Sequence, residues 1–327
     1  MEGEKTMNNK IISIFFAFIA AMLYALNIPF SKLLLEQISP VFMASFLYFG
    51  AGIGMLCLSL LKKGNKEQNK LTKKELPYTL GMIFLDILAP ISLMVGLKWI
   101  SPTNASLLNN FEIVATSCIA LFFFQEKISS KMWAAILLIT LSSVLLSLEE
   151  QTNFSFSYGA IFILLACIFW GMENNCTRML SSKNIVQIVV LKGICSGFGS
   201  FIVAFVIGEH LPHFFLILII LILGFLSYGL SIFFYVKAQK ELGAAKTSAY
   251  YSINPFIGTF LSFLIFQEKL SKYYFLALFI MILGTILVIL DTLFIKHKHI
   301  HSHQSLTEHT HEHIHFVTNL EKHIHKH

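Results

Sequence analysis

The sequence is poor in charged residues. Asp, Glu, Lys and Arg make up 13% of its 327 residues, against roughly a quarter in a soluble domain. Hydrophobic residues make up 56%, and the mean hydropathy is +0.71. A single soluble core of this length cannot bury so much apolar surface. The composition therefore excludes an ordinary soluble domain and predicts the lipid bilayer as a partner.

Cysteine pairs and enzyme motifs are lacking as well. The five cysteines form no Cys-x-x-Cys pair, which excludes a disulfide scaffold and a cysteine metal site. Gly-x-Ser-x-Gly, a phosphate-binding P-loop and His-Glu-x-x-His are all absent, so we predict neither an enzyme nor an ATP-driven pump. The basic residues that give the net charge of +6 fall mostly in the predicted loops, as in a membrane protein. We therefore predict no nucleic-acid partner.

Apolar runs of about 20 residues, the length that spans a bilayer, recur along the chain. The sequence predicts an all-α integral membrane protein with ten transmembrane helices. These lie near residues 11–35, 40–61, 76–97, 102–124, 129–148, 157–180, 184–207, 213–236, 244–266 and 271–295. Gly50-x-x-x-Gly54 and Gly193-x-x-x-Gly197 predict close helix contacts.

Lysine and arginine predict the orientation. With a cytoplasmic N-terminus, 19 of them fall in inside segments and 4 in outside segments. Positive residues prefer the cytoplasmic side. We therefore expect the cell (cytoplasmic) membrane as the location, with both termini in the cytoplasm.

The chain also contains an internal repeat. An offset of 142 residues places Lys98–Ser129 on Lys240–Ser271, and both copies contain Phe-Gln-Glu-Lys. An offset of 146 places the first helix on the sixth. Each unit has five helices, an odd number, so the second unit must be inverted in the membrane. We predict an N-terminal segment 1–10, a first unit 11–148, a second unit 157–295 and a cytoplasmic tail 296–327.

Four segments carry a resemblance to a known family. They are Leu121-Phe-Phe-Phe-Gln-Glu-Lys-Ile-Ser129, Leu264-Ile-Phe-Gln-Glu-Lys-Leu-Ser271, Tyr24-Ala-Leu-Asn27…Ser31-Lys32 and Trp170-Gly…Arg178. With them the chain resembles the EamA type of the drug/metabolite transporter superfamily, which implies ten helices and transport of metabolites. Members often carry a proline after the centre of helices 4 and 9. Asn254-Pro255 keeps it and Glu112-Ile113 does not, so we expect helix 4 to be less kinked.

Several polar residues lie deep inside the predicted spans, where a charge costs ~2.5–3.5 kcal/mol on insertion scales. The candidate cavity residues are Tyr24, Asn27, Asp86, Asn109, Glu112, Trp170, Glu173, Tyr251 and Asn254. Inverted repeats place substrate sites near the midplane between their halves, so we expect a shared central cavity. Hydrogen bonding between helices is the alternative role for Asn27 and Asn109. Asp86 lacks a charged counterpart in the repeat, and Lys192 is expected to extend to the membrane surface.

Burial disfavours the ionised form of a carboxyl group. We therefore expect Glu112 or Glu173 to bind and release a proton during transport.

The last 31 residues hold eleven of the thirteen histidines. They are His297, His299, His301, His303, His309, His311, His313, His315, His323, His325 and His327. Spacing at i, i+2 places imidazoles on one side of an extended chain, which suits Zn, Ni, Co or Cu. We expect a transition metal on the tail and no other cofactor; a merely solvated tail is the alternative.

The sequence thus predicts a secondary transporter, a monomer or homodimer, that moves small metabolites such as amino acids or amines by alternating access. The alternatives are a divalent transition-metal (Ni/Co/Zn) carrier and a metal-responsive membrane sensor without transport. Against the metal carrier, the core of the predicted spans lacks a cluster of His, Asp and Glu with the spacing of metal ligands.

Overall fold

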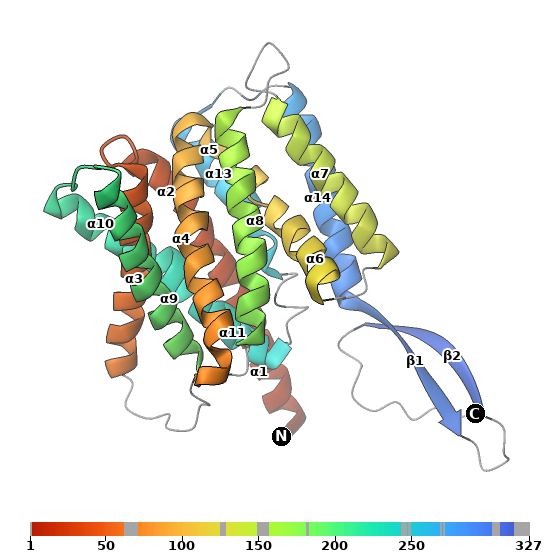
Figure 1. The fold of residues 1–327 in the computed structure, drawn as a ribbon. Coiled ribbons are helices and arrows are strands. Elements are labelled where there is room, and N and C mark those ends of the chain that lie inside the picture. The colour runs from red at the N-terminus through yellow and green to blue at the C-terminus, as the bar shows by residue number, and fades with distance from the viewer. Residues whose placement is uncertain are drawn as a thin grey trace.

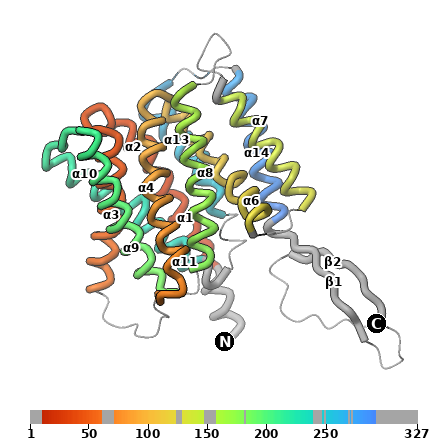
Figure 2. Tube along the Cα trace, viewed as in Figure 1, coloured from red at the N-terminus to blue at the C-terminus, as the bar shows by residue number. Residues whose placement is uncertain are grey.

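The computed structural model describes residues 2–61, 71–124, 129–148, 157–180, 183–242, 247, 250–268, 270, 272–302 and 308–316 (Figure 1). Figure 2 draws in grey the residues whose placement is uncertain, and at the two ends of the chain, 2–10, 292–302 and 308–316, only the backbone is described. Most of the Phe-Gln-Glu-Lys junction at 124–127, including Glu126, lies outside the described residues. His303, His323, His325 and His327 lie outside them too, and the other tail histidines are described only as backbone.

Helices make up the bundle, and Figure 1 shows them lying side by side. In the first half they are α1 (Glu2–Ala25), α2 (Asn27–Leu34), α3 (Pro40–Leu61), η1 (Lys73–Glu75), α4 (Leu76–Trp99), α5 (Pro102–Leu108), α6 (Phe111–Phe124) and α7 (Ser130–Leu148). In the second half they are α8 (Tyr158–Met179), α9 (Ile185–Val206), α10 (Phe214–Gly224), η2 (Phe225–Leu230), α11 (Ser231–Leu242), α13 (Asn254–Phe266) and α14 (Lys272–Leu293). Two strands follow, β1 (Phe294–Ser302) and β2 (Glu308–Phe316).

Within the described residues, 8 segments are long and apolar enough to cross a membrane. Two shorter apolar helices, Ser130–Leu146 and Asn254–Phe266, fall where the fifth and ninth spans are predicted. The described helices therefore form an all-α membrane bundle, and the eight segments and two shorter helices account for the ten predicted spans.

Helix packing follows the repeat. The third helix of the first unit, α4, packs on α8, the first helix of the second unit. In return, α11, the end of the third helix of the second unit, packs on α1. The second helices, α3 and α9, pack on each other, and so do the fifth helices, α7 and α14. Exchange of partners between units is the packing that an approximate twofold axis produces.

Small residues bring α3 and α9 together. A Cβ atom on Gly193 would lie 2.3 Å from the backbone nitrogen of Gly52, and one on Gly50 would lie 2.1 Å from the carbonyl oxygen of Leu221 in α10. Only a hydrogen fits at such distances, so side chains larger than glycine would push the helices apart. The close helix contacts predicted from the glycine spacing are confirmed.

Three membrane helices are interrupted near their centres. The first span turns at Leu26 between α1 and α2, the fourth turns at Asn109 and Asn110, and the ninth turns at residues 252–253. The expectation of a less kinked fourth helix is wrong. Asn110 and Glu112 donate backbone N–H bonds to the carbonyls three residues earlier, Leu107 and Asn109. Asparagine favours such tight turns, so the helix breaks here without proline.

The third helix of each unit is irregular at the same depth. Helix α4 continues through Pro90, which has no N–H, so the carbonyl of Asp86 loses its usual helical partner. In the second unit η2 is a π-helical turn, Phe225–Leu230, and it carries Tyr228, the repeat position of Asp86. π-Turns inside α-helices are frequent at functional sites.

Beyond α14, β1 and β2 pair antiparallel. The register places His297 opposite His313, His299 opposite His311 and His301 opposite His309.

Candidate functional site

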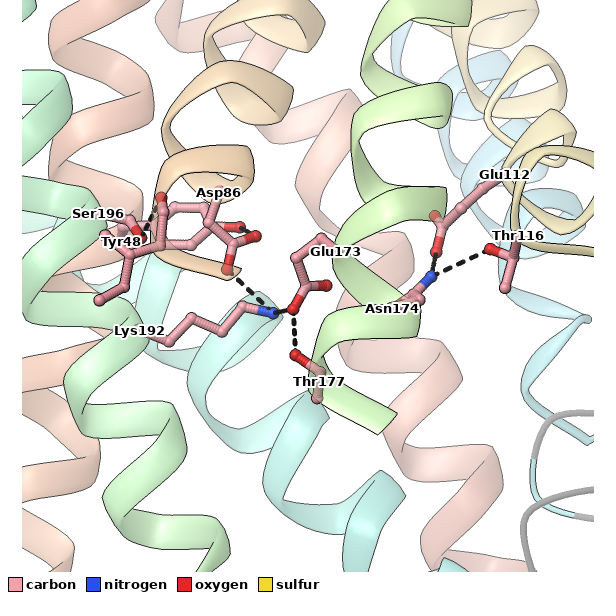
Figure 3. Close-up of polar contacts among 10 residues, drawn as sticks. Tyr48, Asp86, Glu112, Thr116, Glu173, Asn174, Thr177, Lys192 and Ser196 are labelled. Carbon is pink, nitrogen blue, oxygen red and sulfur yellow. Dashed lines mark hydrogen bonds and ion pairs between the residues drawn. The ribbon is translucent and has the colours of Figure 1, made fainter. Parts of the chain in front are cut away.

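A charged trio lies in the interior of the bundle: Asp86 on α4, Glu173 on α8 and Lys192 on α9 (Figure 3). The Nζ atom of Lys192 is 3.1 Å from Oδ2 of Asp86 and 2.9 Å from Oε1 of Glu173. Asp86 is 0%, Glu173 2% and Lys192 9% exposed. One lysine therefore pairs with two carboxylates, one from each unit of the repeat.

This geometry corrects one expectation, because Lys192 does not extend to the membrane surface. Asp86 has an uncharged counterpart in the repeat, Tyr228, but it finds a charged partner on another helix. The physical reason is that a buried ammonium group is stabilised only by paired charges and hydrogen bonds. Two carboxylates on neighbouring helices supply both within about 3 Å.

Neighbouring hydroxyl groups complete the trio. Tyr48 on α3 donates a 2.8 Å hydrogen bond to Oδ1 of Asp86. Thr177, one helical turn beyond Glu173, donates to Oε1 of that glutamate. Both oxygens of Asp86 thus face a donor, whereas Lys192 and Thr177 share a single oxygen of Glu173.

The repeat contains a second, uncharged trio. Asn27 lies 146 residues before Glu173, and Tyr228 lies 142 residues after Asp86. The amide of Asn27 donates a 2.8 Å hydrogen bond to the hydroxyl of Tyr228. The ring of Tyr48 lies 5.1 Å from that of Tyr228, as Lys192 lies beside Asp86. We call Tyr48, Tyr228 and Asn27 the neutral trio, and the bond from Tyr48 to Asp86 joins it to the charged trio.

A separate polar cluster contains Glu112. Asn174 on α8 donates a 2.7 Å bond to Oε1 of Glu112 and lies 3.4 Å from Oγ1 of Thr116. Glu173 and Asn174 are adjacent in sequence but reach different partners, as Figure 3 shows. The structure therefore places Glu112 and Glu173 in two clusters on different sides of α8, although the sequence predicted one cavity for both.

Tyrosines surround the helix breaks near Glu112. The ring of Tyr24 lies 5.7 Å from that of Tyr228 and 6.0 Å from that of Tyr251. Glu112 lies within electrostatic range of all three tyrosines. A small pocket with room for about one water molecule is lined by Tyr24, Ala25, Ile28, Ser106, Asn254, Pro255 and Gly258.

The remaining candidates are Asn109 and Trp170. Asn109 is buried at the break of the fourth span, where the thiol of Cys167 on α8 is 3.7 Å from its carbonyl oxygen. Trp170 is buried and lies beside the hydroxyl of Tyr48. The structure thus brings Tyr24, Asn109, Glu112, Tyr251 and Asn254 around the helix breaks.

No group of three or more His, Cys, Asp or Glu that could hold a metal occurs among the residues with described side chains. Side chains of the tail histidines lie outside that part of the chain, so metal binding by the tail stays a prediction.

Sequence reasoning missed Tyr48, Asn174 and Tyr228 as site residues and gave Lys192 a surface role. A signal existed for Lys192. Two acids in other spans require a cation, and an offset of 144 pairs this lysine with Tyr48, between the offsets of 142 and 146 that the repeat shows elsewhere.

Comparison with known proteins agrees with this architecture. The profile of the EamA-like transporter family matches residues 11–148 and again residues 157–290. The chain belongs to the EamA-like transporter family. This EamA-like protein is 23% identical over 277 residues to an uncharacterized transporter of Methanothermobacter thermautotrophicus, covering 77% of this chain and 78% of that one. Its fold matches a protein of known crystal structure with a TM-score of 0.63 at 14% identity, over 85% of this chain and 96% of the other.

Proposed function

We propose that this membrane transporter is a secondary carrier of small metabolites that bear an amino group, such as amino acids or amines. The observation that supports it most is the position of Glu112. This carboxylate lies at the start of α6, directly after the break at Asn109 and Asn110, within range of three tyrosines.

An ammonium group suits this environment on two counts. It would pair with the carboxylate of Glu112, which at present has a neutral amide partner in Asn174. The faces of Tyr24 and Tyr251 would add cation–π attraction, which grows when the site is desolvated. An amino acid would also bring a carboxylate, and the N-terminus of α13 at Asn254, the half-helix at the pocket, favours that negative group.

The small size of the pocket supports a mechanism of alternating access. A space for about one water molecule does not admit a metabolite, so substrate entry requires the helices around Tyr24 and Asn254 to separate. Because the two halves are inverted copies, the corresponding helices of the other half can open towards the opposite side of the membrane.

We also propose the cytoplasmic membrane as the location, with both termini inside, on the 19-to-4 distribution of basic residues. Single cysteines at positions 127 and 269, in a cysteine-free background, should be labelled from opposite sides by an impermeant reagent. Labelling of both from the same side would rule out the inverted arrangement.

Reconstituted protein provides the functional test. Liposomes loaded with unlabelled lysine, leucine or putrescine should take up the radiolabelled compound by counterflow, and Glu112→Gln should reduce that uptake strongly. Asp291→Asn, which alters a carboxylate bonded to Ser129 at a helix end, is the matched control and should retain it. Absence of counterflow for every amine and amino acid tested would reject the proposal.

A divalent transition-metal carrier is the second candidate, and the histidine pattern of the tail favours it. The same liposomes loaded with a metal-sensitive dye decide between the two. Uptake of Ni²⁺ or Zn²⁺ without any amine flux would replace the first proposal by the second.

A further inference from the structure

Helices α3 and α9 lie antiparallel and touch most closely near their middles. Ser45 on α3 donates a 2.8 Å hydrogen bond to the carbonyl oxygen of Gly197, and a Cβ atom on Gly193 would lie 2.3 Å from the backbone nitrogen of Gly52. Because only hydrogen fits between the two glycines, the helix backbones meet directly there. A contact so close to both helix axes moves little when the helices tilt, so it can serve as a pivot.

One end of this helix pair is held by Glu209, which lies in the segment between α9 and α10. Its two carboxylate oxygens accept the backbone N–H groups of Val41 at 3.2 Å and Phe42 at 2.9 Å, at the start of α3. The first N–H groups of a helix have no partner inside the helix, and a negative charge is favoured beside them. Glu209 belongs to the second half of the repeat and α3 to the first, so this Glu209 contact ties the halves together.

The opposite end carries the repeat-related contact. Nζ of Lys183, just before α9, is 3.1 Å from Oε1 of Glu75, and the backbone N–H of Leu71 donates a 3.3 Å bond to Oε1 of Gln187. We call these two interactions the Glu75 contact. Glu75 precedes the third helix of the first half, as Glu209 precedes the third helix of the second half. In both cases a carboxylate before a third helix binds the start of the second helix of the other half.

We infer that α3 and α9 rock about their glycine contact, and that the Glu209 contact and the Glu75 contact open in alternation, one on each face of the membrane. Both contacts are formed in this structure, which agrees with a pocket too small for a metabolite. Opening one end requires release of its contact while the other end stays tied. The inference goes beyond the proposed function, because it assigns the moving contacts of the carrier and does not depend on the substrate.

The two contacts differ in strength. Glu209 binds two N–H groups of buried residues, and its release would leave both groups without their acceptor. The side chains of Glu75 and Lys183 are each 17% exposed, so water competes for their ion pair. We therefore expect the end held by Glu75 to open more readily than the end held by Glu209.

Hydrogen–deuterium exchange of the full-length protein in lipid nanodiscs tests the inference without a substrate. Each contact contains backbone N–H groups whose exchange reports its opening: Val41 and Phe42 at one end, Leu71 at the other. Glu209→Gln should make exchange of Val41 and Phe42 about tenfold faster or more, because charge-assisted hydrogen bonds are lost. Exchange of Leu71 should become slower in the same variant, because favouring one open state lowers the population of the other.

Lys183→Met is the mirror experiment. It removes the ion pair and leaves Glu75 bonded to Thr72, so the start of α4 keeps its local structure. Exchange at the end held by Glu75 should become about two- to fivefold faster, as for loss of an exposed ion pair, and exchange at the opposite end should become slower. Asp291→Asn, which alters a carboxylate bonded to Ser129 between α7 and α14, is the matched control and should change neither end.

The opposite change at the far end is the deciding result, because loss of a merely structural contact loosens only its own end. The inference is overturned if folded Glu209→Gln or Lys183→Met loosens only its own end, loosens both ends together, or changes neither. Thermal unfolding of each variant shows that it is folded. No substrate is present in these measurements, so a failure here is distinct from a failure of the proposed function.

Discussion

The two trios occupy equivalent places in the repeat but differ in chemistry. Asp86, Glu173 and Lys192 form ion pairs at about 3 Å, whereas the neutral trio, Tyr48, Tyr228 and Asn27, is held by one amide–hydroxyl bond and ring contact. An inverted repeat built from identical halves would carry either trio twice. The difference indicates that both repeat-related positions require polar contacts between helices, whereas only one of the two positions requires charged groups.

The largest expected effect comes from breaking the charged trio. Lys192→Met leaves two buried carboxylates without their cation, and loss of one partner of a buried ion pair costs about 3–5 kcal/mol. We expect a marked loss of thermal stability in detergent, and greater loss at pH 8 than at pH 5, because both acids can be protonated at low pH. Equal stability at both pH values would contradict the pairing in Figure 3.

A smaller effect is expected at the amine site, outside both trios. Glu112→Gln removes a charge but keeps the hydrogen-bonding shape beside Asn174. A charge-assisted hydrogen bond contributes about 1.5–3 kcal/mol, so the affinity for an amine should fall about 10- to 100-fold with little change in unfolding temperature. Competition for counterflow uptake measures the affinity. An unchanged affinity would indicate that the amine binds at the charged trio and not at Glu112. The two clusters would then not have separate roles.

The neutral trio should respond less than the charged one. Tyr228→Phe removes the acceptor of the Asn27 amide but keeps the ring, and a neutral hydrogen bond contributes about 0.5–1.5 kcal/mol. Asn27 retains its 3.1 Å contact with Ser31. We expect a modest fall in unfolding temperature that is the same at pH 5 and pH 8. A pH-dependent fall would show that this trio too carries charge.

Truncation after Lys296 should affect neither trio. The full-length protein is expected to bind Zn²⁺, Ni²⁺, Co²⁺ or Cu²⁺ in calorimetry at pH 7.5, and binding should weaken below about pH 6.5 as the imidazoles gain protons. The truncated protein should lose this binding and keep its unfolding temperature. Its transport should lose any response to metal if the tail is regulatory. Equal metal binding by both proteins would show that the tail does not bind the metal and is merely a solvated segment.

Much of the architecture could be predicted from sequence, because lipid imposes strong rules. Apolar runs gave the positions of the spans, and the Phe-Gln-Glu-Lys repeat indicated two halves. The break at Asn109 and Asn110 was missed because proline was the signal sought, and asparagine turns have a weaker signature. The glycines at 193 and 50 did predict close contacts of α3, with α9 and with α10 respectively, since only hydrogen fits there.

The candidate site could be predicted only in part. The sequence shows that Asp86, Glu112 and Glu173 lie inside spans, but it does not show which helices meet. Lys192 lies about two turns into α9, and its stem could reach either water or the interior. Tertiary packing decides between these, so the partition of the two glutamates between different clusters required the structure.

Pro90 places Asp86 at a point where helix α4 can bend, in addition to the ion pair that Asp86 forms. The carbonyl of Asp86 has no backbone donor one turn ahead, so α4 is weakest against bending at the residue that holds the ion pair with Lys192. A change of charge in the charged trio would therefore act on α4 at the point where this helix bends most easily. The ion pair of Lys192 with Asp86 is thus placed where a small change in its strength would alter the bend of the whole helix α4.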